Sequence, residues 1–246
     1  YGARDPRSLT LRFHTQTAGC SLTAQQPLVN IVRVTIQALA GVLGGTQSLH
    51  TDSYDESLCL PTEDAVRIAL RTQQVIAHES GVTNTIDPLG GSYFVEQLTD
   101  RMEADALAYI DRIEAMGGIV AAIEQGYPQK EIADASFRYQ QQVDRGEKVI
   151  VGVNRFQIPR DEDMKIPLLR ISQEVEDRQI ARLRGTKANR NQAAVDEALE
   201  RLVRGCERGE NTFPLILDAV KLYATVGEIC SAMKVVFGAY EETSVL

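Results

Sequence analysis

The residues best suited to chemistry lie in one stretch of the chain, from Gly44 to Glu56. Within it Thr46, Ser48 and His50 alternate with other side chains in the two-residue period of a strand. Three carboxylates follow that strand, at Asp52, Asp55 and Glu56. A buried polar group without a hydrogen-bond partner costs about 1–3 kcal/mol, so a strand this polar fits best beside a cavity, water or a ligand. We therefore interpret it as the floor of a binding site.

The carboxylates are compatible with more than one role. General acid–base chemistry requires one carboxyl group with a raised pKa, and the sequence identifies no residue that would raise it. Carboxylates also accept hydrogen bonds from hydroxyl groups such as those of a ribose. A third interpretation is a solvated acidic loop before a helix that opens at Leu60-Pro61-Thr62-Glu63. The spacing of the residues leaves the three roles open.

Two histidines, His14 and His50, fall on the polar faces of separate predicted strands. If these strands are parallel neighbours, both imidazoles could reach one mouth and bind a metal ion, with Asp52 or Glu56 as a third ligand. Their spacing matches no short metal motif, however. A hydrogen-bonded histidine in or beside a pocket is the interpretation that we prefer.

Alternating strand and helix patterns must position these residues. Leu9 to Gln16 predicts a strand, and the stretch from Gln26-Pro27 to Gly44 predicts a helix. After the polar strand come a helix through Ser80, a third short strand at Val82–Ile86, and a helix from about Tyr93 to Met116. Successive parallel strands joined by helices build α/β sheets or barrels. Three such units cannot close an eight-stranded barrel, so either the sheet is open or other strands lie on residues not present here.

The pattern changes at Gly117, where the chain becomes mainly helical. Helices are predicted at 119–124, 128–144, 174–185, 192–207, 213–223 and 226–237, with a short strand-like run at 148–153. Phe156 to Pro167 lacks a clear period and predicts a connecting segment. We therefore expect two regions: an α/β region over residues 1–116 and a helical linker or docking region over 117–246.

Composition narrows the classes of function. The 246 residues are 43% hydrophobic, which suffices for a sizeable core, and the net charge is −8. That charge gives no general attraction to nucleic acid or to anionic membranes, and no apolar run reaches the 18 or so residues that a membrane span needs. The four cysteines form no CxxC pair, which favours free thiols in a cytoplasmic protein. The chain lacks a starting Met, so we expect the numbering to begin inside a longer polypeptide.

Several motifs, in order along essentially the whole chain, resemble those of the catalytic subunit of adenosylcobalamin-dependent acyl-CoA mutases, the methylmalonyl-CoA mutase family. The first is Leu11-Arg12-Phe13-His14-Thr15-Gln16-Thr17-Ala18-Gly19, followed by Ser21-Leu22-Thr23-Ala24-Gln25-Gln26. The others include Gly44-Gly45-Thr46-Gln47-Ser48-Leu49-His50-Thr51, Asp55-Glu56, Leu60-Pro61-Thr62, Glu79-Ser80-Gly81, Asp87-Pro88-x-Gly90-Gly91-Ser92, residues 149–154 and Thr225-Val226-Gly227-Glu228-Ile229.

The resemblance implies a (β/α)8 TIM barrel that binds a coenzyme A ester along its axis and adenosylcobalamin (coenzyme B12) at its C-terminal mouth. The present chain would supply the C-terminal portion, the last three βα units, followed by a mainly helical region. The implied reaction is a radical carbon-skeleton rearrangement of an acyl-CoA, favouring methylmalonyl-CoA to succinyl-CoA, with an isobutyryl-CoA-type mutase as an alternative. The implied partners are the remainder of the catalytic barrel and a cobalamin-binding domain or subunit, and the chain alone is expected to be inactive.

The resemblance also assigns residues by position. Gln47 resembles the family's cobalamin-side glutamine, and Glu56 the glutamate that binds the adenosyl ribose. Gly45 stands where some members place histidine at the cofactor face, and Asp52 stands where asparagine is usual. His14 and His50 are expected to support these residues without touching the cofactor. The DxHxxG motif that supplies the cobalamin ligand is absent from this sequence, so we expect no metal ligand among its residues.

Three hypotheses follow. The chain is the C-terminal part of a mutase catalytic subunit, or it is a non-catalytic scaffold whose helical half docks a cobalamin-binding partner. A metal-dependent lyase using His14 and His50 is the weakest of the three. The residues that would select the acyl group lie outside this sequence.

Overall fold

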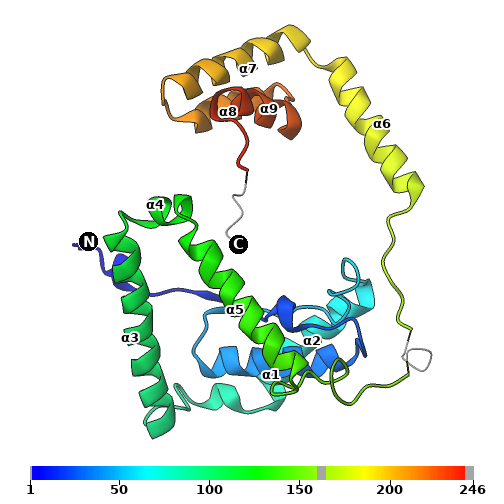
Figure 1. Ribbon diagram of the computed structural model, residues 1–246. Coiled ribbons are helices and arrows are strands. Elements are labelled where there is room, and N and C mark those ends of the chain that lie inside the picture. Colours follow the sequence, from blue (N-terminus) through cyan, green and yellow to red (C-terminus); the bar gives the residue numbers. More distant parts are fainter. Residues whose placement is uncertain (1, 160–164, 242–246) are drawn as a thin grey trace. The chain divides into compact units, whose positions relative to one another are not determined.

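The computed structural model describes residues 2–159 and 165–241, which form two compact units (Figure 1). One unit ends at Arg170 and the other begins at Ile171. The predicted connecting segment, Phe156 to Pro167, ends three residues before Arg170, and residues 160–164 of it lie outside the described residues. The expected division after residue 116, between a barrel portion and a helical region, stays a prediction.

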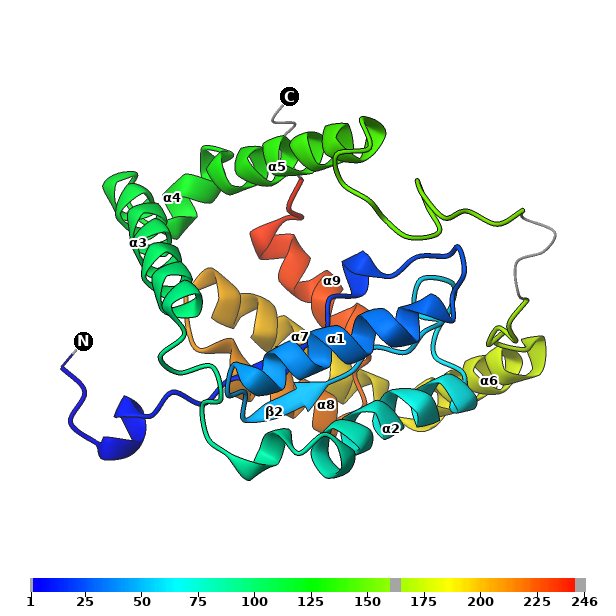
Figure 2. The same ribbon diagram turned by 90° about the horizontal axis from the view of Figure 1, so that it is seen from below.

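The described residues of the first unit contain one sheet, a parallel pair of strands. Strand β1 (His14–Gln16) pairs with β2 (Ser48–His50) in the register His14 to Ser48 and Gln16 to His50. Helix α1 (Val29–Leu43) connects them and buries Val34 and Ala38, one turn apart, while Figure 2 shows β2 beside α1. A β-helix-β connection of this kind confirms the α/β class, and the wider barrel stays a proposal.

Helix α1 approaches β1 closely because glycine occupies position 41. A Cβ at Gly41 would lie 3.1 Å from Thr15 Cγ2, tighter than almost all real contacts. The helix ends at Gly44, and Gly45 follows with φ +79°, a conformation that glycine adopts without strain. These glycines therefore set where β2 begins and how closely the helix covers the sheet.

Three strand predictions are corrected, one in its starting residue and two entirely. The predicted strand from Leu9 begins only at His14, because a 3₁₀ turn, η1 (Pro6–Leu9), precedes it and both Leu9 and Leu11 are exposed. The predicted strand at Val82–Ile86 is instead η3 (Val82–Asn84), a 3₁₀ turn entered through Gly81 at φ +72°. The strand-like run at 148–153 forms turns with a single bridge between Val151 and Arg155. The third βα unit therefore lacks its strand within the described residues.

The other helices of the first unit match the predicted positions. They are α2 (Glu63–Glu79), α3 (Tyr93–Ala115), α4 (Ile119–Glu124) and α5 (Tyr127–Asp144), with the short η2 (Gly19–Ser21) near the sheet. Helix α2 buries Ala65, Ala69, Thr72 and Ile76, at alternating steps of four and three residues that define one face. Helix α3 buries none of its residues.

The second unit contains α6 (Gln173–Asn189), α7 (Gln192–Glu207), α8 (Thr212–Lys221) and α9 (Val226–Phe237), which confirms its helical character. An oxygen of the preceding Ser, Asn or Thr side chain caps each helix at Ser172, Asn191, Asn211 and Thr225. The last three helices enclose a core of Ala198, Leu202, Cys206, Ala219 and Ile229. No helix among residues 2–159 and 165–241 combines the length and apolar character that a membrane crossing requires.

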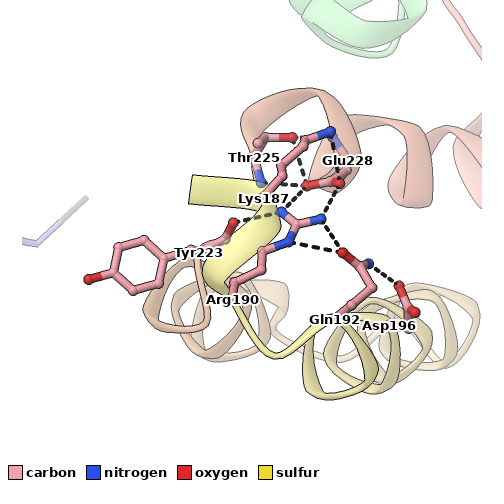
Figure 3. A network of polar contacts seen from close by, with 7 residues as sticks. All are labelled: Lys187, Arg190, Gln192, Asp196, Tyr223, Thr225 and Glu228. Carbon is pink, nitrogen blue, oxygen red and sulfur yellow. Dashed lines mark hydrogen bonds and ion pairs between the residues drawn. The ribbon is translucent and has the colours of Figure 1, made fainter. Parts of the chain in front are cut away.

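A polar cluster also joins these helices (Figure 3). The Arg190 guanidinium donates to both oxygens of Glu228, at 2.8 and 2.6 Å, and Lys187 lies 3.2 Å from the same carboxylate. The N–H and hydroxyl of Thr225 each donate to Glu228 at 2.8 Å, which completes a capping box. We call these four residues the Glu228 cluster.

Candidate functional site

Loop 51–56 follows β2, and its first five residues are buried although four of them are polar. Thr51 Oγ1 donates to the Ala69 carbonyl at 2.7 Å, and Gln73 donates to Thr51 at 3.0 Å, so the loop is attached to α2. Asn30 of α1 donates to the Tyr54 carbonyl at 2.9 Å. Side chains on two helices therefore hold the loop in place beyond the end of the sheet.

Asp52 is one of two fully buried acids in this loop, with its side chain wholly removed from solvent. Its backbone N–H donates to Thr17 Oγ1 at 2.9 Å, and its Oδ1 accepts from Gln16 Nε2 at 2.9 Å. His50 Nε2 lies 3.7 Å from the same oxygen. No N–H group or hydroxyl of the described residues donates to Oδ2, so this buried acceptor depends on the Glu56 carboxyl group, water or a ligand for a partner. Such an atom is costly unless a ligand or water satisfies it.

Glu56 adjoins Asp52 while remaining accessible to solvent. Partial burial raises the pKa of Glu56 above its ordinary value, and the charge of Asp52 and a hydrogen bond between the two carboxyl groups raise it further. His50 acts in the opposite direction. A Cβ at Gly19 would overlap with Glu56 Oε1, so glycine there makes room for the carboxylate. We call Asp52 and Glu56 the carboxylate pair.

Asp55 is also fully buried but serves mainly to shape the loop. Its Oδ2 accepts from the N–H and the hydroxyl of Thr62, both at 2.9 Å, at the N-terminus of α2. Asp55 Oδ1 and Ser53 Oγ lack partners among the described residues. The hydrogen bonds from Thr62 to Asp55 fix the start of α2.

The residues assigned by resemblance fall into two groups at opposite ends of β2. Gln47 precedes the strand, and its amide is engaged by the Phe13 N–H and the Gly45 carbonyl, both at 2.8 Å. A Cβ on Gly45 would meet nothing within 4 Å. Asp52 and Glu56 follow the strand, so five residue steps of extended chain, roughly 16 Å, separate Gln47 from Asp52. The structure thus brings Asp52 and Glu56 together but does not bring Gly45 or Gln47 to them.

The two histidines have different partners. His14 Nδ1 lies 2.7 Å from Ser48 Oγ, whereas His50 faces Asp52. Within the part of the chain that the structure describes, no group of three or more His, Cys, Asp and Glu side chains is placed to hold a metal ion. The metal-dependent lyase hypothesis therefore gains no support from the arrangement.

Sequence reasoning missed four residues that build the site: Gln16, Thr17, Gly19 and Asn30. The first three lie within a motif that was recognised, but nothing in their spacing indicated contact with Asp52 or Glu56. Asn30 did carry a signal, because it stands four residues before Val34 and eight before Ala38, on the buried face of α1. A polar residue on an apolar stripe indicates a specific buried hydrogen bond.

Comparison with known proteins identifies the family. The family model described as methylmalonyl-CoA mutase matches residues 1–239. The chain belongs to the methylmalonyl-CoA mutase family. Over 246 residues it is 46% identical to the 2-hydroxyisobutanoyl-CoA mutase large subunit of Aquincola tertiaricarbonis, covering all of this chain and 44% of that relative.

Two further members of the methylmalonyl-CoA mutase family show the same pattern. The methylmalonyl-CoA mutase of Escherichia coli K12 is 45% identical over 241 residues, covering 98% of this chain and 34% of the relative. The mitochondrial methylmalonyl-CoA mutase of Bos taurus is 44% identical over 239 residues, covering 97% of this chain and 32% of that relative. The chain therefore spans less than half the length of these curated relatives.

The carboxylate pair fits the adenosyl part of the cofactor that the mutase family implies. A ribose offers two hydroxyl donors, and the pair offers a buried acceptor without a partner at Asp52 Oδ2 and an accessible carboxyl group on Glu56. No lysine or arginine forms an ion pair with either residue in the described chain. The acceptors are thus free to bind hydroxyl groups instead of a cation.

Proposed function

We propose that this chain is the C-terminal part of the catalytic subunit of an adenosylcobalamin-dependent acyl-CoA mutase, in which the carboxylate pair binds the hydroxyls of the adenosyl group. The observation that supports this function best is Asp52 Oδ2, a fully buried carboxylate oxygen to which no N–H or hydroxyl of the described residues donates, beside the accessible Glu56. Family membership supports the acyl-CoA mutase class. The partial (β/α)8 barrel, over residues 1–116, is part of the same proposal.

When bound, adenosylcobalamin supplies a carbon-centred radical through homolysis of its cobalt–carbon bond. The residues of this chain would bind and orient the adenosyl end. Asp52 is held by Thr17 and Gln16, so its free oxygen has a fixed direction. Glu56 is accessible to solvent, and its carboxylate would accept a hydrogen bond from a ribose hydroxyl. Gly45 and Gln47 would bind the cofactor from the opposite end of β2.

The substrate is proposed as an acyl-CoA, with methylmalonyl-CoA to succinyl-CoA as the favoured reaction. Relatives named for methylmalonyl-CoA and for 2-hydroxyisobutanoyl-CoA share 45% and 46% identity with the chain, so overall similarity does not choose between them. The remainder of the barrel and a cobalamin-binding domain or subunit are the proposed partners. A cytoplasmic location stays a prediction, since the relatives include both bacterial and mitochondrial proteins.

The test is Glu56→Gln in the complete mutase that contains this chain. We expect the Kd for adenosylcobalamin to rise about tenfold, the loss of roughly one charge-assisted hydrogen bond, and turnover to fall with it. Glu63→Gln is the matched control, because Glu63 is an exposed glutamate that pairs only with Arg67 on the surface of α2. Unchanged Kd and turnover in Glu56→Gln would overturn the assignment.

The scaffold hypothesis keeps one supporting observation. Helices α7, α8 and α9 enclose their own core, yet Phe213, Val226 and Val235 are each at least 70% exposed. A complete mutase in which Glu56→Gln and Asp52→Asn both retain wild-type cofactor affinity would favour that hypothesis over a direct role in binding.

A further inference from the structure

Asn30 is the one fully buried amide side chain among the described residues of α1. Its Nδ2 donates to two carbonyls, those of Thr23 and Tyr54, each at 2.9 Å. Its Oδ1 accepts from the Thr23 N–H at 3.1 Å and from Arg33 Nη1 at 2.7 Å. All four contacts have ordinary hydrogen-bond lengths, so the amide group is satisfied on both sides.

These contacts fix the orientation of the amide. Arg33 and a backbone N–H are donors only, so the oxygen of Asn30 must face them and the nitrogen must face the two carbonyls. Arg33 is itself held, through Nη1 to Thr23 Oγ1 at 2.9 Å and Nη2 to the Val151 carbonyl at 2.7 Å. The amide of Asn30 therefore has one direction in which every partner is satisfied.

The two carbonyls belong to the two loops that follow the paired strands. Thr23 lies in the loop after β1, which also contains Gly19, and Tyr54 lies in the loop after β2, between the two members of the carboxylate pair. The chain separates Asn30 from Tyr54 by 24 positions. A single NH₂ group on α1 thus joins the two loops, and the position of Glu56 against Gly19 depends on their separation.

We propose that Asn30 is a positioning residue for the carboxylate pair: its amide sets the distance between loops 19–23 and 52–56 and so directs Glu56 and the free oxygen of Asp52 toward one ligand. The role rests on the proposed function, in which that ligand is the adenosyl group. Asn30 touches neither member of the pair and would act through the Tyr54 backbone.

Asn30→Asp separates this role from a general contribution to packing. The substitution keeps the size and the oxygen that binds Arg33, but an ionised carboxylate cannot donate to the Tyr54 carbonyl. In the complete mutase we expect Asn30→Asp to raise the Kd for adenosylcobalamin about tenfold and leave the KM for the acyl-CoA within about twofold. Without cofactor, hydrogen exchange in a peptide spanning residues 50–58 should become faster.

Asn154→Ala is the matched control, because Asn154 also joins loop segments through three short contacts, to Ile150 N, Val143 O and Lys148 O. It should lower the melting temperature and leave cofactor affinity and the exchange of residues 50–58 unchanged. The proposal is overturned if Asn30→Asp leaves exchange at 50–58 unchanged, or if Glu56→Gln weakens cofactor binding and Asn30→Asp does not. If Glu56→Gln has no effect, the proposed function fails, and the exchange result alone still decides whether Asn30 positions the loop.

Discussion

Two carboxylate centres, one in each unit, differ in what surrounds them. Glu228 accepts from Arg190 and Thr225 and lies beside Lys187, and these contacts, Arg190 first, hold its pKa well below the ordinary value (Figure 3). Among the described residues the carboxylate pair has no lysine or arginine partner, includes a buried oxygen to which no N–H or hydroxyl donates, and includes a glutamate whose pKa is raised. A carboxylate whose acceptors are filled from within the chain stabilises the fold, whereas one with a free acceptor is available to a ligand.

The largest effect should come from removing the Glu228 carboxylate. Glu228→Ala leaves the guanidinium of Arg190, whose side chain is only 2% exposed, without its counter-ion and also removes the capping box. We expect the melting temperature of the second unit to fall by roughly 10 °C in thermal unfolding followed by circular dichroism. Asp218→Ala, which breaks the exposed contact with Arg201 at 3.9 Å, should change it by less than about 2 °C. Equal shifts in the two variants would contradict the role given to the cluster.

The two centres should respond to pH in opposite directions. Because the pKa of Glu228 is lowered on folding, its stabilisation is present above the ordinary value of 4.5 and is lost as the pH falls below it. The melting temperatures of wild type and Glu228→Gln should therefore converge in acid.

Because the pKa of Glu56 is raised on folding, the folded chain binds the Glu56 proton more tightly than the unfolded chain does. The stabilisation from this proton is present below pH 4.5 and is lost as the pH rises through the raised pKa. The melting temperature of Glu56→Gln should therefore rise relative to that of wild type toward neutral pH, and the two should be equal in acid. If the melting temperatures of Glu228→Gln and Glu56→Gln, each relative to wild type, changed with pH in the same direction, the distinction between the two centres would be wrong.

A smaller effect is expected from Gly19→Ala. The added Cβ would overlap with Glu56 Oε1, the end of a flexible side chain, so the carboxylate should move while the fold remains. We expect a roughly threefold increase in the Kd for adenosylcobalamin in the complete mutase, with the melting temperature within about 2 °C of wild type. Gly185→Ala, where a Cβ would meet nothing within 4 Å, is the control and should leave the Kd unchanged. A Kd unchanged in both variants would mean that Gly19 does not position Glu56.

Prediction from sequence succeeded where structure is local. The bounds of α7 and α9 were predicted to the residue, because an apolar stripe and a capping residue mark the same ends. Prediction failed where a strand requires a neighbouring strand to pair with. Leu9 and Leu11 alternate as strand residues do, yet only His14–Gln16 pairs with another strand. At 82–86 the left-handed conformation of Gly81 redirects the chain into a 3₁₀ turn.

The same limit applies to the candidate site. Asp52 and Glu56 were selected from type and resemblance, but their environment depends on contacts with residues 35 to 36 positions away, such as Thr17 and Gln16. The separation of Gln47 from the carboxylate pair follows from the direction of β2, which residue types do not encode.

The parallel pairing of β1 with β2 also bears on how the chain folds. The sheet joins residues 34 positions apart, as in the contact between His14 and Ser48, and must wait until α1 and the intervening loops have brought the strands together. The contacts of α7 with α8 join helices that follow one another directly along the chain. We expect the C-terminal helices to acquire protection first in pulsed hydrogen exchange, so the candidate site would be among the last parts of the chain to form.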